Sequence, residues 1–152
     1  MQIDKIDNLL ELFYRQYQKK NKETIFLQSL KEPRKEYSWE DVYSNINKLS
    51  EEISKHIKKG DRCLLVSENR PEWMISDLSI MLSGGVTVPA YATYTERDYE
   101  YIINDCTPSI IIISDEIQYE KIKNIIPKKD FIKKIIFFEN IENINQELSL
   151  KI

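Results

Sequence analysis

The sequence predicts an α/β fold: a doubly wound, mainly parallel sheet flanked by helices. From residue 62 onward, short apolar runs alternate with amphipathic stretches, as in chains built from strand–helix–strand units with right-handed crossovers. Ile110–Ile113 are four consecutive isoleucines, and this lack of alternation indicates a strand buried on both faces. The chain has 152 residues, of which 41% are hydrophobic and 31% charged. We therefore expect residues 1–152 to form a single α/β domain.

The first predicted element is a helix that ends at residues 21–23. A strand over residues 24–30 and a turn over residues 31–34 follow it. Apolar residues at helical spacing indicate the helix, and charged residues separate them. These apolar residues are Ile6, Leu9, Leu10, Phe13 and Tyr17.

A second helix is predicted over residues 37–59. Ser38 can cap its first turn, and Asp41, three residues later, can reach back to the free amides as in a capping box. Gly60 follows two lysines, as expected where a helix ends in a left-handed residue. The apolar face of this helix comprises Val42, Ile46, Leu49, Ile53 and Ile57.

The next unit is a strand over residues 62–67 followed by a helix. Asn69 is the predicted N-cap, Glu72 completes a capping box, and Pro71 fits the first turn because its missing amide would be unbonded there. The packing surface of this helix is Trp73, Met74, Leu78, Met81 and Leu82. The pair Gly84-Gly85 is expected to end it.

The alternation continues to the end of the chain. After a strand over residues 86–91, Thr95 and Asp98 predict another capped helix, whose inward residues include Tyr99 and Ile103. The remaining predicted elements are a strand over 109–114, a helix over 115–126, a strand over 133–139 and a polar tail over 140–152. Two interpretations of the tail stay open: it is frayed, or it is an element whose packing partner is missing.

Composition excludes several classes of function. The net charge is −3 and the pI is near 5.4, so the chain lacks the basic field of nucleic-acid-binding proteins. No stretch of about 20 apolar residues exists to span a membrane, although peripheral membrane contact stays open. Asp4, Asp7 and Glu11 interrupt any signal-peptide core. Cys63 and Cys106 are too few for a disulfide framework, and we predict a cytoplasmic protein.

The residues themselves predict no catalytic, cofactor-binding or metal-binding site in this chain. The loops at the carboxyl ends of the predicted strands, 67–70, 92–95 and 114–116, carry no glycine-rich phosphate cradle. The single histidine, His56, lacks an evident nucleophile or orienting group, and Glu51-Glu52 belongs on a solvent face. Trp39, Trp73 and the nine tyrosines are expected to pack rather than to stack on bases. The lysines at positions 121, 123, 128, 129, 133 and 134 form a modest basic patch among acids.

Five short motifs occur in order between residues 24 and 114, at the spacing of a known family. They are Tyr37-Ser38-Trp39-Glu40, Gly60-Asp61-Arg62, Ser67-Glu68-Asn69-Arg70-Pro71-Glu72-Trp73, Val88-Pro89-Ala90-Tyr91-Ala92-Thr93 and Tyr101-Ile102-Ile103-Asn104-Asp105-Cys106. Together they resemble the opening of the adenylate-forming (AMP-binding) superfamily, and the fourth motif resembles the long-chain acyl-CoA synthetases in particular.

The resemblance implies a two-step ligase. In such enzymes ATP activates a fatty acid carboxylate to an acyl-adenylate with loss of pyrophosphate, coenzyme A then displaces AMP, and Mg²⁺ neutralises the phosphates. The family's phosphate loop, adenine motif, magnesium-associated glutamate and C-terminal lysine do not occur in these residues. The resemblance therefore implies an N-terminal scaffold that is inactive by itself. It also implies that five residues act as fold determinants: Asn69, Pro71, Trp73, Pro89 and Tyr91.

Further expectations concern partners. The remainder of the same enzyme is the expected partner, and apolar surface left uncovered without it favours self-association. Two other readings stay open. One is a short, non-catalytic interaction module, which the absence of catalytic motifs supports. The other is a ligase for an aryl or short-chain acid, against which the match at Tyr91-Ala92-Thr93 argues.

Overall fold

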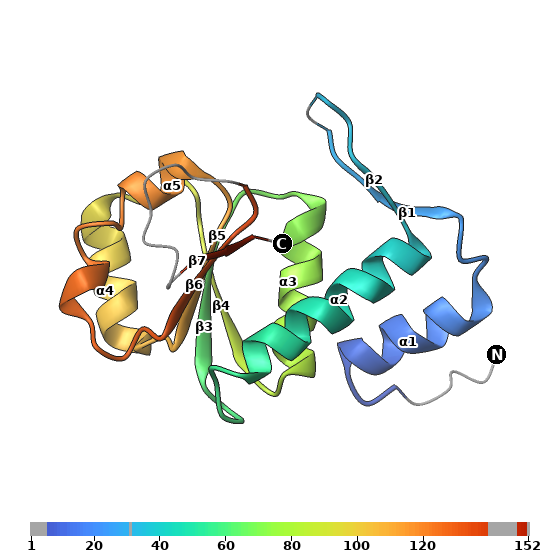
Figure 1. Ribbon diagram of the computed structural model, residues 1–152, viewed down its shortest axis with the longest axis horizontal. Helices are drawn as coiled ribbons and strands as arrows, with labels where there is room; N and C mark the ends of the chain where they lie inside the picture. The colour runs from blue at the N-terminus through green and yellow to red at the C-terminus, as the bar shows by residue number, and fades with distance from the viewer. Residues whose placement is uncertain (1–5, 31, 140–148, 152) are drawn as a thin grey trace.

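In the part of the chain that the structure describes, five parallel strands form the central sheet, in the order β4-β3-β5-β6-β7 (Figure 1). The computed structural model describes residues 6–30, 32–139 and 149–151. The strand order reverses between β3 and β5, as in doubly wound folds, so the predicted fold class is confirmed. The strands are β3 (Arg62–Val66), β4 (Val86–Ala90), β5 (Ile110–Ile113), β6 (Lys134–Phe137) and β7 (Ser149–Lys151).

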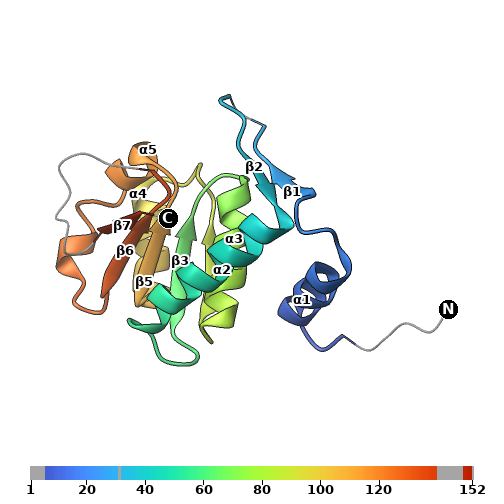
Figure 2. The ribbon, with the colours of Figure 1, turned by 45° about the vertical axis from the view of Figure 1, so that its right-hand side comes forward.

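Helices cover both faces of this sheet. The helices are α2 (Trp39–Ser54) and α3 (Pro71–Leu82) on one face, and α4 (Glu96–Cys106) and α5 (Glu116–Glu120) on the other (Figures 1 and 2). Successive residues of β3 accordingly belong to two apolar clusters. Cys63 and Leu65 pack toward α2 and α3, and Leu64 and Val66 pack toward α4. All four residues of β5 are fully buried, which confirms the two-sided burial expected of this strand.

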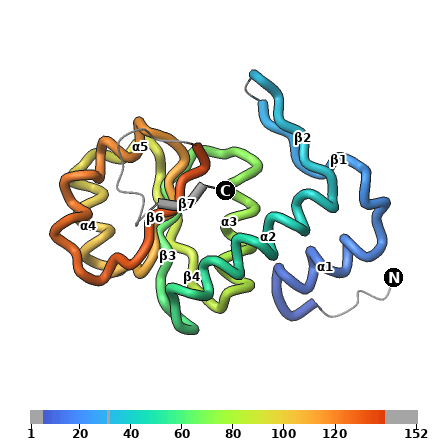
Figure 3. Tube along the Cα trace, viewed as in Figure 1, coloured from blue at the N-terminus to red at the C-terminus, as the bar shows by residue number. Residues whose placement is uncertain are grey.

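The N-terminal residues form a small unit beside the sheet. Helix α1 (Leu9–Lys19) leads into an antiparallel hairpin of β1 (Ile25–Gln28) and β2 (Glu36–Ser38), which projects from the body of the molecule (Figure 3). Phe26 of β1 stacks on Trp39 with ring centroids 3.9 Å apart, and the buried ring of Phe13 lies 5.9 Å from the same indole. The strand at residues 24–30 was predicted, whereas β2 was not.

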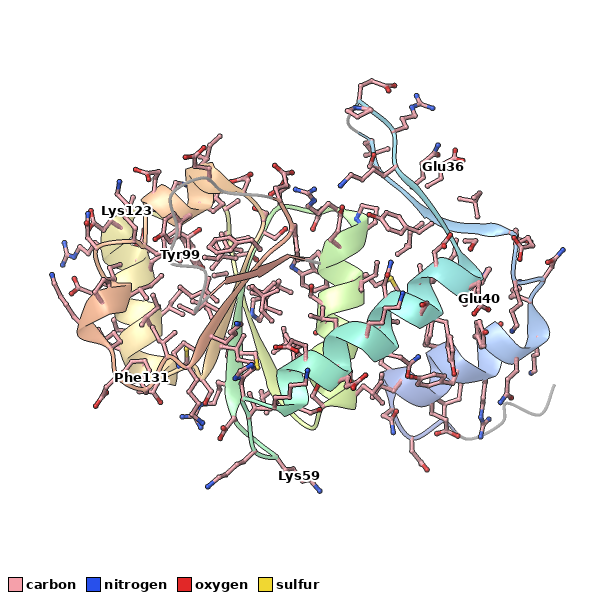
Figure 4. The ribbon with its side chains drawn as sticks, viewed as in Figure 1. Glu36, Glu40, Lys59, Tyr99, Lys123 and Phe131 are labelled. Atoms are coloured by element: carbon pink, nitrogen blue, oxygen red, sulfur yellow. The ribbon has the colours of Figure 1, made fainter. Side chains whose placement is uncertain are left out.

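Local capping signals predicted two helix starts correctly. Ser38 and Asp41 form a capping box at α2, and Thr95 and Asp98 form one at α4. The inward face predicted for α4 is also present. Tyr99 and Ile103 are fully buried, and Figure 4 shows Tyr99 on the inner side of that helix.

Two predicted helix boundaries are wrong. Helix α2 ends at Ser54, so Gly60 is not its cap. Gly60 instead has a φ of 88° in the turn before β3, where its amide donates to the carbonyl of Gly84. Helix α5 ends at Glu120 rather than at residue 126. A turn and a short 3-10 helix (Ile126–Lys128) replace the predicted later turns, and they still bury Ile122 and Ile125 in the core.

The end of α3 matches the prediction and its start does not. Gly84 has a φ of 80°, and the amides of Gly84 and Gly85 donate to the carbonyls of Met81 and Ile80, which is the hydrogen-bond pattern of a Schellman motif. The N-cap, however, is Arg70, without a side-chain capping bond, and not Asn69. The predicted role of Glu72 in a capping box is therefore wrong as well.

Strand β4 lies at the edge of the sheet and contains Pro89. The amide of Val86 donates to Asp61 at the start of β3, so alternate residues of β4 turn their amides toward β3. The nitrogen of Pro89 consequently lies on the outer side, where it removes no sheet hydrogen bond.

The C-terminal tail was predicted over residues 140–152. Residues 140–148 and 152 lie outside the described part of the chain. Residues 149–151 form β7, which pairs in parallel with β6. This strand was not predicted.

We expect Ser38→Ala to lower the free energy of unfolding by about 1 kcal/mol, because the buried cap serves both β2 and the first turn of α2. Urea denaturation monitored by circular dichroism measures the change. Ser44→Ala, inside the same helix, is the matched control and should shift stability by less than about 0.5 kcal/mol. Equal effects of the two substitutions would contradict the capping role.

Candidate functional site

A cleft of about 650 Å³ lies between the β1–β2 hairpin and the carboxyl ends of β3 and β6. Open α/β sheets bind ligands at this end, so the cleft is the first candidate site of the fold. The predicted loop 67–70 contributes to it. Its lining includes apolar residues of the hairpin and of α3, namely Leu27, Leu30, Pro33, Pro71 and Met74.

The guanidinium of Arg70 is the centre of the polar side of this cleft. Its Nε donates to Glu72 over 3.0 Å, and its Nη1 donates to Glu139 over 3.1 Å and lies 3.4 Å from Glu68. The same group lies 5.4 Å from the ring centroid of Phe138. These contacts tie together the loop after β3, the start of α3 and the end of β6.

Glu72 extends this network to the hairpin. Its carboxylate accepts hydrogen bonds from Lys35 Nζ at 3.1 Å and from the Tyr37 hydroxyl at 3.0 Å, although the residue is only 6% exposed. Burial by itself would raise the pKa of Glu72. Hydrogen bonds from Arg70 and from the backbone outweigh burial and hold the pKa at about 2.

The pKa values of two partners of Glu72, Tyr37 and Arg70, are both raised. Burial and then the charge of Glu72 raise the pKa of Tyr37. Burial alone would lower the pKa of Arg70, but the hydrogen bond and charge of Glu72, followed by those of Glu139 and Glu68, raise it. The phenol therefore stays neutral and the guanidinium stays charged, which is the state in which each donates to a carboxylate.

The loop at residues 92–95 is held by a second polar network. Lys121 Nζ donates to the carbonyl of Ala92 at 2.6 Å, and the hydroxyl of the buried Tyr99 donates to the carbonyl of Tyr91 at 2.8 Å. Gln118, which is 7% exposed, lies within hydrogen-bond distance of both Lys121 and Tyr99. The loop at residues 114–116 has a different role, because Asp115 caps α5.

The other residues weighed as candidates are dispersed. His56 has an orienting group after all, since Glu52 Oε1 lies 3.2 Å from its Nε2, but Glu52 also binds Lys55 at 2.6 Å. Cys63 is fully buried, and burial raises the pKa of its thiol to about 12. Within the described ranges no cluster of His, Cys, Asp or Glu could hold a metal ion, and no helix is long and apolar enough to cross a membrane.

Three lysines of the expected basic patch make separate contacts. Lys123 pairs with Glu120 on α5, Lys129 donates to Asn104 of α4, and Lys133 lies 3.7 Å from Asp61. Each of these lysines therefore serves a different local contact.

The cleft does not fit a nucleoside triphosphate or its Mg²⁺. A phosphate site needs convergent backbone amides or unengaged cations, whereas Arg70 already contacts three carboxylates and Lys35 contacts one. Helix α3 begins with Pro71, which offers no amide, followed by the carboxylate of Glu72.

The five residues predicted as fold determinants lie in different surroundings. Pro71 is buried at the first position of α3, and Trp73 packs against the apolar cluster under α2 and α3. The side chains of Tyr91, which is 72% exposed, and Pro89 lie at the surface, and the Tyr91 ring contacts that of Tyr94 with centroids 5.4 Å apart. Asn69 lines the cleft.

Sequence reasoning missed the network of ion pairs and hydrogen bonds around Arg70 and Glu72. The signal present in the sequence was the local run of charge around Pro71, formed by Glu68, Arg70 and Glu72. The more distant members, Lys35, Tyr37 and Glu139, left no pattern in the sequence.

We expect the free energy of unfolding to fall as the pH drops from about 5 to about 2, partly through Glu72. Its folded pKa of about 2 lies below the ordinary 4.5, so the unfolded chain binds the proton first. The stabilisation is complete above pH 4.5 and lost as pH falls through 2, and is on the order of 3 kcal/mol.

Urea denaturation at several pH values checks this expectation. Glu72→Gln should lower stability at pH 7 and flatten the acid limb of the profile. Glu100→Gln on the outer side of α4 is the matched control and should leave the limb unchanged. An unaltered acid limb in Glu72→Gln would show that other carboxylates carry it.

Curated relatives of this chain are long-chain-fatty-acid–CoA ligases. The human ligase ACSBG1 is 25% identical over 107 residues, which cover 66% of this chain and 15% of the relative. The long-chain-fatty-acid–CoA ligase of Bacillus subtilis is 30% identical over 82 residues, covering 53% of this chain and 15% of the relative. The chain thus spans only a small part of the length of these relatives.

Solved structures agree with the fold. A mutant form of coronafacic acid ligase from Pectobacterium brasiliense superposes with a TM-score of 0.82 at 15% identity, over 93% of this chain and 27% of the ligase. At that identity the likeness concerns the fold alone. The model of the AMP-binding enzyme family matches residues 13–149, nearly the whole chain. The chain therefore belongs to the AMP-binding (adenylate-forming) enzyme family, of which it comprises part of a domain homologous to acyl-CoA ligases.

Proposed function

We propose that this chain is the N-terminal scaffold of an ATP-dependent long-chain fatty acid–CoA ligase. The whole enzyme would convert fatty acid, ATP and coenzyme A to acyl-CoA, AMP and pyrophosphate through an acyl-adenylate. The observation that carries this proposal is the family match over residues 13–149, together with the five motifs in family order. The human and Bacillus subtilis relatives are long-chain-fatty-acid–CoA ligases, which supports a fatty acid as the substrate.

The proposed role of these residues is structural. Their contribution is the parallel sheet, the covering helices and the Arg70–Glu72 network that fixes the carboxyl end of the sheet. ATP, Mg²⁺ and coenzyme A would bind the remainder of the enzyme, which is also the proposed partner of this chain. We propose a cytoplasmic location for the enzyme.

The fold does not by itself select the fatty acid as substrate. The structure with a TM-score of 0.82 is a coronafacic acid ligase, so enzymes with differently named acids share this fold. A ligase for another carboxylic acid, such as an aryl or short-chain acid, is therefore the second candidate. The scaffold residues described here do not form an acyl pocket that would discriminate between the two.

We expect the polypeptide encoded by the whole reading frame to catalyse ATP–pyrophosphate exchange that depends on a long-chain fatty acid. A panel of saturated acids of increasing length, with benzoate and acetate as the matched alternatives, measures the substrate class. Exchange with benzoate or acetate alone would replace the fatty acid by the second candidate. A reading frame that ends without a Thr/Ser/Gly-rich phosphate loop would instead support a non-catalytic module.

The chain of 152 residues alone should bind ATP weakly or not at all, because its cleft lacks a phosphate cradle. Isothermal titration calorimetry with ATP and Mg²⁺ tests this, with ADP and with buffer lacking Mg²⁺ as controls. Micromolar, magnesium-dependent binding would contradict the scaffold role.

A further inference from the structure

A second hollow, separate from the cleft, lies along the outer edge of the sheet. This groove of about 450 Å³ is lined by residues of α3 and of the edge strand β4. Trp73, Asp77 and Met81 are spaced four residues apart on α3 and form one stripe along the groove. The residues lining the groove are Trp73, Asp77, Met81, Gly85, Val86, Thr87 and Pro89.

The groove contains polar groups that lack partners. Asp77 is half-buried, and its carboxylate makes no hydrogen bond or ion pair with any residue that the structure describes. The hydroxyl of Thr87, a lining residue, is buried and makes no hydrogen bond with any described residue. A carboxylate that is partly removed from water is stabilised by a neighbouring cation. The unpaired carboxylate of Asp77 is therefore the feature of the groove that favours a cationic partner.

The chemistry of the groove favours a guanidinium as the missing group. A cation beside an indole gains from its π-face, and a planar guanidinium can at the same time donate a pair of hydrogen bonds to a carboxylate. Trp73 and Asp77 stand one helical turn apart on α3 and both line the groove, so their side chains are near enough for one guanidinium to contact both. The apolar walls formed by Met81 and Val86 suit the methylene stem of an arginine and an apolar neighbour.

A further strand is a poor occupant of this edge. Pro89 offers no amide on the outer side of β4, so an added strand would lose a hydrogen bond there. An occupant of the groove would therefore contact it through side chains.

We propose that the α3–β4 groove is a docking site for an arginine flanked by apolar residues, carried by the remaining polypeptide of the ligase. This inference rests on the proposed function. In the coronafacic acid ligase structure the matched region is 27% of the chain, so most of such an enzyme lies outside the part described here and is available to cover the groove.

A titration with a charged and a neutral isostere tests the groove directly. Isotope-labelled chain is followed by NMR while N-acetyl-arginine amide or N-acetyl-citrulline amide is added. The arginine probe should shift the Trp73 indole and Thr87 amide signals and bind at least about fivefold more tightly than the citrulline probe. Asp77→Asn should abolish that difference, whereas Glu100→Gln on α4 should preserve it. Equal shifts from the two probes, or an unchanged difference in Asp77→Asn, would overturn the proposal.

Two further measurements identify the occupant. In the whole ligase Asp77→Asn should lower the melting temperature, whereas in the 152-residue chain it should leave it unchanged or raise it, because an unpaired carboxylate is removed. Light scattering should show no dimer that depends on Asp77. An Asp77-dependent dimer would assign the groove to a second copy and overturn the proposed occupant. None of these readouts uses ligase activity, so failure of the groove and failure of the proposed function are distinguishable.

Discussion

Burial of β3 and β5 on both faces is the constraint on which the rest of the fold depends. These central strands are lined by Leu, Val, Cys and Ile that are fully buried, so each face needs a cover of helices. Parallel strands can be joined only by crossovers, and the crossover helices supply that cover. All the loops after the strands then meet at one end of the sheet. The cleft, the Arg70 network and the Lys121–Ala92 contact lie at that end because the topology leaves them no other place.

The elements that sequence reasoning predicted correctly are those specified by neighbours in the chain. The capping boxes at Ser38 and Thr95 each need a partner only three residues away, and the four isoleucines of β5 carry their own burial pattern. Strands β2 and β7 could not be predicted in this way. Each has three residues, and each exists through pairing with another strand rather than through its own periodicity. Helix α5 was overextended because Ile122 and Ile125 are as apolar as a helix would require, but they are buried from turns instead.

In the candidate site, too, local contacts could be predicted from the sequence and contacts between distant segments could not. Glu72 was assigned a local role at the start of α3, yet its partners Lys35 and Tyr37 come from a hairpin 37 and 35 residues earlier. A buried carboxylate with three donors costs little and fixes geometry, whereas the same carboxylate without them would be strongly destabilising. The network therefore orients the hairpin against the sheet, and it leaves no cation unengaged for substrate phosphates. This arrangement agrees with a scaffold and explains why sequence motifs identify the family while the site lacks its chemistry.

Pro89 has a consequence for behaviour at high concentration. The central strand and its flanks read Ser-Ile-Ile-Ile-Ile-Ser, a segment with the high β-propensity, absence of charge and absence of proline that are typical of amyloid-forming peptides. While the chain is folded, this segment is enclosed between β3 and β6. Folded molecules can associate through their sheets only where a strand of one molecule hydrogen-bonds to an exposed edge of another. At the edge strand β4, Pro89 has no amide to donate, so it interrupts this pairing. Pro89, although exposed, thus disfavours aggregation through the buried, amyloid-like segment of β5.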